Sequence, residues 1–198
     1  MRLVLASNSA SRRQMLEKAG VPFDVMAATV DEDQAKASLR AEGIDPRGLA
    51  DALAELKATR VSARLPGVLV LGCDSTVALE DGTMIDKAPD RPALAEQLAA
   101  MAGRPHSLYS AAVIVENGQP VWRHVDRAKL LMRNMSDEFI RDYLDREGDV
   151  LLGCVGGYRM EGLGVQLFSR VEGSHFTILG LPLVPLLDYL RTRGVIAR

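Results

Sequence analysis

The sequence has few cysteines, almost no net charge and no long hydrophobic run. Only two of its 198 residues are cysteine, and Cys73 and Cys154 form no CxxC arrangement. Nothing at the N-terminus resembles a signal peptide. These absences are typical of a chain that works in a reducing compartment, so we expect a cytoplasmic location.

The small net charge disfavours polyanionic partners. Lys and Arg number 24 and Asp and Glu number 26, which gives a formal net charge of -2 at pH 7. A chain with this balance has no general attraction to nucleic acid or to an anionic membrane, so local basic residues must meet any anion that it recognises. Charged residues interrupt every apolar run well before the ~20 residues that span a bilayer. We therefore expect a soluble protein with a small-molecule partner.

The length of the chain suits one well-filled core and does not by itself require two domains. No internal repeat, linker or low-complexity tract separates one part of the sequence from another. The sequence therefore predicts a single domain over residues 1–198, in which two lobes are allowed. The oligomeric state, a homodimer included, stays open.

Residues 68–90 hold the densest group of candidate catalytic side chains. The apolar run 68–71 predicts a strand buried on both faces, which we expect to end at the polar residues 72–76. Asp74 would then lie at the end of a buried strand, where a carboxylate is costly to desolvate unless it is paired or bound to a metal. After a turn at Asp81-Gly82, Lys87 lies between two aspartates. This set suits an oxygen-ligated divalent metal beside a phosphate, whereas for Asp74 alone a simple turn cap is the alternative.

The N-terminal segment predicts an anion site. A short strand at 3–5 is followed by a serine-rich stretch and by a helix that ends near Gly20. Backbone N–H groups at the helix start, together with Ser9, Arg12 and Arg13, would suit a polyphosphate. The alternative is an ordinary N-cap followed by two solvated arginines.

Two further charged positions come from the next part of the chain. An acidic triplet at 31–33 follows a predicted strand at 23–26, and taken alone it is more simply a solvated loop than a ligand set. Residues 34–64 predict two helices separated by a break at 43–46. Lys57 lies at the edge of the apolar stripe of the second helix, so its side chain could reach inward or extend to solvent.

The second half of the chain predicts a helix at 93–101, a hairpin turning at Asn117-Gly118 and a helix that starts at Ser136. The glycine-rich stretch 148–173 does not match a dinucleotide-binding motif, because alternating apolar residues follow it instead of a helix. We expect residues 165–168 to continue as a strand to a turn at Gly173-Ser174. A terminal helix through residues 186–190 closes the chain.

Six segments, taken in order, closely resemble the Maf family. They are LASNSASRR (5–13), LGCDSTV (71–77), DKAPD (86–90), MAGRPHSLYS (101–110), GGYRMEGLG (156–164) and GLPL (180–183). The resemblance implies an α/β fold with a twisted mixed central sheet flanked by helices, in two lobes with a cleft, similar to the inosine triphosphate pyrophosphatase-like fold. It also implies a pyrophosphatase that hydrolyses a nucleoside triphosphate to its monophosphate and diphosphate with a divalent cation, Mg2+ or Mn2+.

The resemblance also assigns roles to matching residues. Asp74 matches a catalytic base or metal ligand, Glu32 an acidic position taken as a second metal ligand, and Lys57 and Lys87 two catalytic lysines. Ser9, Arg12 and Arg13 match the phosphate-binding motif, and His106 matches a position for which we expect a structural role. The family's GKP is here Asp86-Lys87-Ala88, which keeps the lysine but changes the loop.

Two positions bear on the base of the nucleotide. Cys154 and Glu161 resemble the 7-methylguanosine triphosphate subgroup, whereas the thymidine and uridine triphosphate subgroup carries lysine and glutamine there. A carboxylate at 161 can accept from the two donors on the guanine edge and suits a cationic methylated purine. The match is incomplete, because Ser75 stands where that subgroup usually has glutamine.

Three alternatives stay open beside this interpretation. The first is a pyrophosphatase that prefers thymidine or uridine triphosphate. The second is a binding protein in septum formation or cell-division arrest, the process to which the family was first linked, with the nucleotide site only regulatory. The third is a metal-independent thiol enzyme using Cys73 or Cys154, which we rank last because neither cysteine has a paired histidine signal.

Overall fold

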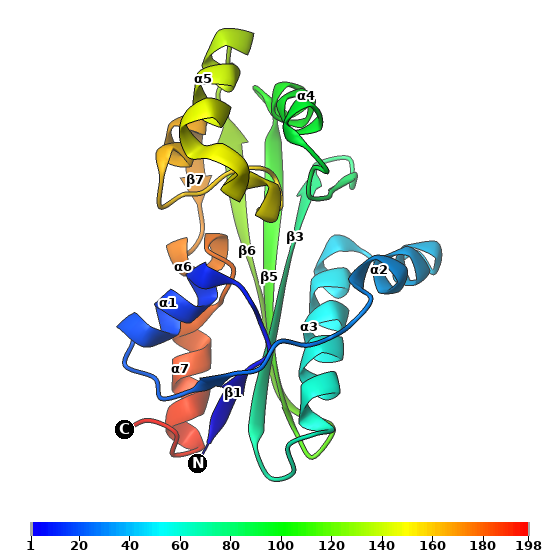
Figure 1. Cartoon of the computed structure of the whole chain (residues 1–198), viewed down its shortest axis with the longest axis vertical. Helices are drawn as coiled ribbons and strands as arrows, with labels where there is room; N and C mark the ends of the chain where they lie inside the picture. The colour runs from blue at the N-terminus through cyan, green and yellow to red at the C-terminus, as the bar shows by residue number, and fades with distance from the viewer. Residues whose placement is uncertain (1, 198) are drawn as a thin grey trace. The chain divides into compact units, whose positions relative to one another are not determined.

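A computed structural model describes residues 2–197, which form two compact units (Figure 1). Of the described residues, unit 1 contains 2–75, 109–126 and 174–197, and unit 2 contains 76–108 and 127–173. Each unit is therefore assembled from segments that are distant in the sequence.

Helices and strands are mixed along the chain. The strands are β1 (Leu3–Leu5), β2 (Asp24–Val25), β3 (Leu69–Leu79), β4 (Met84–Ile85), β5 (Pro105–Glu116), β6 (Gln119–Met132) and β7 (Phe168–Glu172). The α-helices are α1 (Ala10–Lys18), α2 (Glu32–Ala41), α3 (Pro46–Ser62), α4 (Arg91–Met101), α5 (Asp137–Glu147), α6 (His175–Ile178) and α7 (Leu183–Thr192). Two 3-10 helices, η1 (Gly148–Gly153) and η2 (Leu163–Leu167), precede β7.

The strands form a mixed seven-stranded sheet in the order β2-β1-β3-β5-β6-β7, with β4 paired to β3. β1 is parallel to both β2 and β3, whereas β4 and β7 are antiparallel to their partners. Strands β3, β5 and β6 each contribute residues to both units. The predicted α/β class, with a mixed sheet flanked by helices, is confirmed.

In unit 1 the sheet is covered by helices on both faces (Figure 1). Side chains alternate along a strand, so Leu3 and Leu5 pack with α1 and α7 on one face, whereas Val4 packs with α3 on the other. The same alternation assigns Leu71 to the α1 and α7 face and Val70 to the α3 face. Strands buried on both faces explain the continuous apolar runs at 3–5 and 69–71.

Helix α3 crosses β3 at Gly72 with almost no space between the two backbones. A Cβ atom at Gly72 would lie 2.0 Å from the carbonyl oxygen of Ala54 and 2.9 Å from the Cβ of Ala58. Only glycine fits there, and only small residues fit opposite it. This contact determines which part of α3 faces the middle of β3, and Lys57 lies in that part.

Unit 2 is built around α4 and α5. Leu94, Leu98 and Met101 of α4 and Ile140 and Tyr143 of α5 are buried. The glycine-rich segment packs against both helices, since a Cβ at Gly157 would lie 2.3 Å from a methyl carbon of Leu94, and the Tyr143 hydroxyl donates to the Gly157 carbonyl at 3.2 Å. The glycines therefore allow close packing within unit 2.

Three expectations for local structure are wrong. β3 does not end at 72–76 but runs unbroken to Leu79, so Asp74 lies in its interior. The triplet 31–33 is not a loop, because Asp31 caps α2 and accepts from the Gln34 N–H. Residues 163–167 form η2, and only 168–172 form the strand β7. The helices at 93–101 and 186–190 and the Asn117-Gly118 turn are confirmed, with φ of 51° and 76° at the turn.

Among residues 2–197, none of the helices combines the length and the hydrophobicity that crossing a membrane requires. The longest, α3, has 17 residues and carries several charges. This agrees with the charged residues that interrupt each apolar run of the sequence.

Candidate active site

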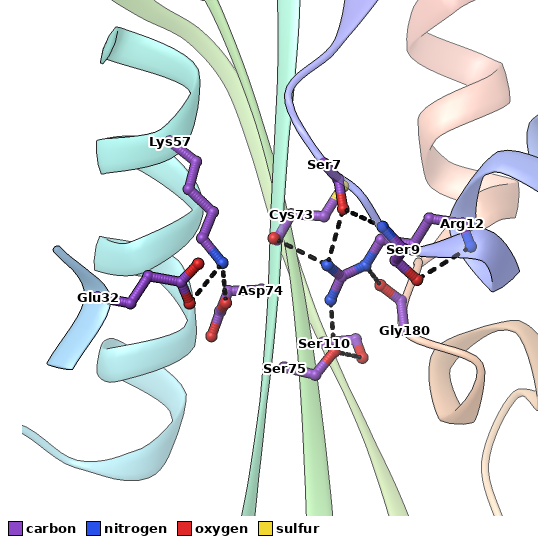
Figure 2. Close-up of polar contacts among 10 residues, drawn as sticks. All are labelled: Ser7, Ser9, Arg12, Glu32, Lys57, Cys73, Asp74, Ser75, Ser110 and Gly180. Atoms are coloured by element: carbon purple, nitrogen blue, oxygen red, sulfur yellow. Dashed lines mark hydrogen bonds and ion pairs between the residues drawn. The ribbon is translucent and has the colours of Figure 1, made fainter. Parts of the chain in front are cut away.

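Three charged side chains of unit 1 meet on the α3 face of β3 (Figure 2). The Lys57 ammonium lies 2.6 Å from Asp74 Oδ1 and 3.0 Å from Glu32 Oε2. The side chains of Lys57 and Asp74 are only 10% and 9% exposed, and that of Glu32 is 40% exposed. We call Lys57, Asp74 and Glu32 the lysine–carboxylate cluster. Lys57 and Asp74 are thus paired inside the fold, whereas Glu32 is partly open to solvent.

Local structure places each member of this cluster. Lys57 follows Leu53 and Ala54 on the buried face of α3, and Asp74 points to that face because it is two residues after Gly72 on β3. Glu32 is the first residue of α2, directly after its N-cap Asp31. The neighbour β1 pairs with β3 only as far as Leu71, so the polar part of β3 begins where β1 has ended.

The side chain of Arg12 is held on the other face of β3. Its Nε donates to the Gly180 carbonyl at 2.8 Å, and its Nη1 donates to the Cys73 carbonyl at 3.1 Å and to Ser7 Oγ at 3.3 Å. Its Nη2 donates to Ser75 Oγ at 3.0 Å. We call Arg12 with these four acceptors the Arg12 clamp.

The other residues of the predicted phosphate site lie at the start of α1. Ser9 is the N-cap, and its hydroxyl accepts from the Arg12 N–H. Arg13 is exposed, and among residues 2–197 its side chain has no ion pair or hydrogen-bond partner. The structure therefore separates the two arginines: Arg12 is bound within the protein, and Arg13 extends to solvent.

A chain of hydroxyl groups continues from the Arg12 clamp, and the sequence did not reveal it. Ser75 Oγ lies 2.9 Å from Ser110 Oγ, and Ser110 Oγ donates to the Thr177 carbonyl at 2.7 Å. The Thr177 hydroxyl donates to Asp126 Oδ2 at 2.6 Å. Ser110 and Thr177 are fully buried. The available signal was a serine directly before the apolar run 111–115 of β5, since a serine in such a strand needs a buried partner.

The remaining predicted site residues lie in unit 2. Lys87 is exposed in the loop that follows β4, and its charge acts on the thiol of Cys154. Glu161 pairs with Arg159, and its Oε1 lies 3.4 Å from the Nε of Arg159. The Nη1 of Arg159 also lies 3.6 Å from the Oε2 of Glu147. Glu147 in turn accepts from the Leu163 N–H at 2.5 Å. Glu161 thus lies on a turn that two ion pairs hold in place.

His106 has the surroundings of a structural residue. It is 1% exposed, its Nε2 lies 3.0 Å from the Tyr158 hydroxyl, and its ring lies against Tyr158 and Phe168. Burial lowers the pKa of His106 to about 4, so the ring is neutral at pH 7. Burial also raises the pKa of Tyr158 well above its ordinary value. We expect neither group to exchange protons in a reaction at neutral pH.

Neither cysteine has the surroundings of a nucleophile. Cys73 is fully buried, and burial raises its pKa to about 11. Burial and the charge of Glu161 also raise the pKa of Cys154, although Arg159 and Lys87 oppose the shift. Both thiols therefore stay protonated at pH 7, which disfavours the thiol enzyme among the alternatives.

The lysine–carboxylate cluster fits a divalent metal only in part. Among residues 2–197, no group of three or more His, Cys, Asp or Glu side chains is arranged to hold a metal ion. Asp74 and Glu32 do supply hard carboxylate oxygens around one point of positive charge, now occupied by the Lys57 ammonium. Mg2+ commonly takes one or two protein carboxylates and completes its shell with water and substrate phosphates. The donors therefore fit a cation that binds together with a polyphosphate.

Comparison with known sequences decides the family. The profile of the family described as Maf-like protein matches residues 2–193. The chain belongs to the Maf family. Its relatives include proteins named nucleoside triphosphate pyrophosphatase from two bacteria. The one from Sphingopyxis alaskensis is 51% identical over 195 residues, which is 98% of both chains, and the one from Ruegeria pomeroyi is 52% identical over 196 residues. The latter match covers 98% of this Maf chain and 97% of the relative.

Two solved structures match this Maf protein at low sequence identity. A nucleoside-triphosphatase, described as a dITP/XTP pyrophosphatase, from Mycobacterium abscessus is 17% identical over 98% of both chains, with a TM-score of 0.49. A HAM1 protein from Coxiella burnetii is 15% identical, and the match covers 67% of this chain and 73% of that protein, with a TM-score of 0.43.

Proposed function

We propose that this Maf-family chain is a nucleoside triphosphate pyrophosphatase of the cytoplasm that removes unwanted nucleotides from the pool. It would hydrolyse the bond between the α- and β-phosphates and release a nucleoside monophosphate and diphosphate. The observation that carries the proposal is the lysine–carboxylate cluster, in which a buried lysine holds a buried aspartate at 2.6 Å. The family membership and the names of its close relatives support the same reaction.

Asp74 is the residue that we expect to act on the attacking water. Among the described residues, the hydrogen bond to its carboxylate is made through Oδ1, which leaves Oδ2 to accept a proton. As the water oxygen bonds to phosphorus in line, its proton passes to Asp74, the bridging P–O bond breaks, and the diphosphate leaves with the electron pair. Lys57 holds the carboxylate in place and remains near the developing negative charge.

Asp74 and Glu32 would hold the divalent cation, Mg2+ or Mn2+. When bound, such a cation neutralises phosphate charge and favours the ionised form of a bound water. Asp74 can serve as a base or as a ligand. Whether Asp74 is the base or a metal ligand, we expect activity to depend on the metal and Asp74→Asn to lose turnover.

The charge of the leaving diphosphate would be met by exposed cations. Arg13 extends from the start of α1, where backbone N–H groups also favour an anion, and Lys87 is exposed in its loop. A cation without an internal partner can bind a phosphate without first giving up another contact. Arg13 therefore suits this role better than Arg12, whose donors are mostly occupied.

Glu161 supports a preference for a purine, and in particular for 7-methylguanosine triphosphate. Its Oε1 lies 3.4 Å from the Nε of Arg159, and a carboxylate only accepts hydrogen bonds. The guanine edge offers N1–H and N2–H2 donors, and methylation at N7 adds a positive charge. Thymine presents the acceptors O2 and O4, which a carboxylate cannot satisfy. The proposed base preference is argued from Glu161, so this preference can be wrong while the pyrophosphatase assignment stands.

A turnover screen over ordinary and modified nucleoside triphosphates tests the proposal. We expect diphosphate and monophosphate as the products, activity that requires added Mg2+ or Mn2+, and the highest kcat/KM for 7-methylguanosine triphosphate. Release of orthophosphate alone, or full activity in a chelator, would contradict the reaction. Tight nucleotide binding without turnover under any metal would instead favour the binding protein among the alternatives.

A further inference from the structure

The two groups of polar residues around Asp74 lie on opposite faces of one strand. Asp74 points toward α3 and Lys57, whereas the Arg12 clamp lies on the face toward α1 (Figure 2). Along β3 the side chains alternate, so Cys73 and Ser75 point away from the face to which Asp74 points. Arg12 is therefore connected to the residues on both sides of Asp74 and not to its carboxylate.

The hydrogen bonds of the guanidinium leave little for a ligand. Arginine has five N–H donors in a rigid fork. Four hydrogen bonds run from Arg12 to the Gly180 carbonyl, the Cys73 carbonyl, Ser7 and Ser75. Binding a phosphate through two parallel hydrogen bonds would require the clamp to open and would leave half-buried acceptors without donors.

The direction of the hydroxyl hydrogen bonds can be worked out from the number of protons. The one proton of Ser110 is donated to the Thr177 carbonyl, so in the contact between Ser110 and Ser75 it must be Ser75 that donates. With its proton used, Ser75 offers only lone pairs to Arg12, which is what the guanidinium needs. The chain from Thr177 to Arg12 therefore has a single consistent polarity, and it fixes the Ser75 side chain.

We infer that Arg12 is a positioning residue for Asp74, whereas the adjacent Arg13 is the arginine that contacts the phosphates. Arg12 holds the carbonyl of Cys73, which belongs to the peptide bond before Asp74, and the side chain of Ser75 after it. These two contacts hold the backbone of β3 on both sides of Asp74. They therefore determine the local pleat of the strand and the direction of the Asp74 carboxylate toward Lys57. Ser75 and Ser110 support the same geometry without contacting substrate.

Kinetics and binding of Arg12→Ala and Arg13→Ala separate the two roles, and this part of the inference rests on the proposed function. For Arg12→Ala we expect kcat to fall about a hundredfold with KM nearly unchanged, since a misplacement of about 1 Å can cost this much. Its affinity for inorganic diphosphate, measured by calorimetry, should stay within about twofold of wild type. For Arg13→Ala we expect diphosphate affinity to fall about tenfold, as for the loss of a phosphate contact.

Chemical rescue gives a readout that a merely structural role would not provide. Free guanidinium in the millimolar range should restore part of the turnover of Arg12→Ala, because it can occupy the vacated clamp, and ammonium at equal ionic strength should not. Arg13→Ala is the matched control, because Arg13 is exposed and no acceptor among residues 2–197 pairs with its side chain. Ser110→Ala and Ser75→Ala are milder variants, for which we expect kcat to fall several-fold with diphosphate affinity unchanged.

A measurement without turnover keeps the inference separate from the proposed function. The 13C signal of the Asp74 carboxyl group, assigned by its absence in Asp74→Asn, should shift in Arg12→Ala and Ser75→Ala but not in Arg13→Ala. An unshifted Asp74 signal, or an Arg12→Ala variant that loses diphosphate affinity as Arg13→Ala does, would overturn the inference. A wild-type chain that releases no diphosphate from any triphosphate would overturn the proposed function alone, since both other measurements remain decisive.

Discussion

The pair of Lys57 with Asp74 in unit 1 differs in burial from two ion pairs of unit 2. In unit 1, Lys57 and Asp74 pair inside the fold at about one-tenth exposure. In unit 2, the ion pairs of Arg91 with Asp149 and of Arg104 with Asp81 join side chains that are 42% to 76% exposed. Exposed pairs contribute between 0 and about 1 kcal/mol, whereas breaking a buried pair by removing one partner costs about 3 to 5 kcal/mol.

This difference agrees with the proposed function, in which the buried pair serves chemistry and exposed charges serve recognition or solubility. A buried pair is costly to desolvate and is weak evidence for stability, so its presence in unit 1 is better explained by a reaction that needs a fixed carboxylate. Glu161 in unit 2 is about one-third exposed and lies on a turn, which suits a residue that reads part of a ligand. Substitutions in the two units should therefore change different measurements.

The largest effect is expected for Asp74→Asn. The amide keeps the shape of the side chain but loses its basicity and charge, so turnover should fall about a thousandfold or more. Circular dichroism should show an intact fold, because the amide oxygen can still accept from Lys57. A variant with near-normal turnover would show that Asp74 is only a structural partner of Lys57 and would break the contrast between the units.

Lys57→Met should reduce stability as well as activity. Removing the ammonium leaves Asp74 buried without its partner, so the free energy of unfolding should fall by about 3 kcal/mol. Chemical denaturation measures this loss. The double variant Lys57→Met, Asp74→Asn is the matched control, and it should recover much of the stability while remaining inactive. An equally unstable double variant would indicate that packing, and not the unpaired charge, is responsible.

His106 should make unit 2 sensitive to acid. Burial lowers the pKa of His106 to about 4 in the folded state, against about 6.5 in an unfolded chain. Below pH 6.5 the unfolded chain binds a proton that the folded chain does not, so this contribution to stability falls as the pH falls and is lost below about pH 4. The full loss is about 3 kcal/mol. Unfolding curves at a series of pH values should show this slope for wild type, and His106→Gln should flatten it.

The smallest effect is expected for Glu161→Gln, and it concerns specificity. A glutamine can donate as well as accept, so the preference for 7-methylguanosine triphosphate over thymidine triphosphate should fall by about tenfold to a hundredfold. The measurement is kcat/KM for both substrates in both proteins. A wild type that already favours thymidine or uridine triphosphate would remove Glu161 from base recognition but leave the unit 1 predictions untouched.

The glycine-rich segment shows why one part of the sequence was misleading. Val165 and Leu167 alternate with polar residues, which predicts a strand, yet they lie in η2. Gly164 packs against the backbone of Arg159, with a would-be Cβ at 2.4 Å from its carbonyl oxygen, and Leu167 is buried. The close packing of a tight turn therefore outweighs the alternation of apolar and polar residues that predicts a strand.

The sequence by itself determined most elements of the fold and named the three charged residues that meet on the α3 face of β3. Ser9 and Ser136 cap helices as their positions predict, and the apolar runs form the buried strands, because capping and periodicity depend on residues only a few positions apart. Asp74 and Lys87 indicated hard-oxygen and phosphate chemistry from their residue types, and the resemblance to the Maf family added Glu32 and Lys57.

Only the tertiary structure decided how these residues divide the work. Arg12 and Arg13 satisfy the same local pattern, and nothing near them in the sequence distinguishes a clamp from a phosphate contact. The difference arises from acceptors at Cys73, Ser75 and Gly180, which lie 61 to 168 positions from Arg12 along the chain. The inward direction of Lys57 likewise follows from the close crossing of α3 over Gly72. Contacts between distant segments depend on packing, and no local pattern encodes them.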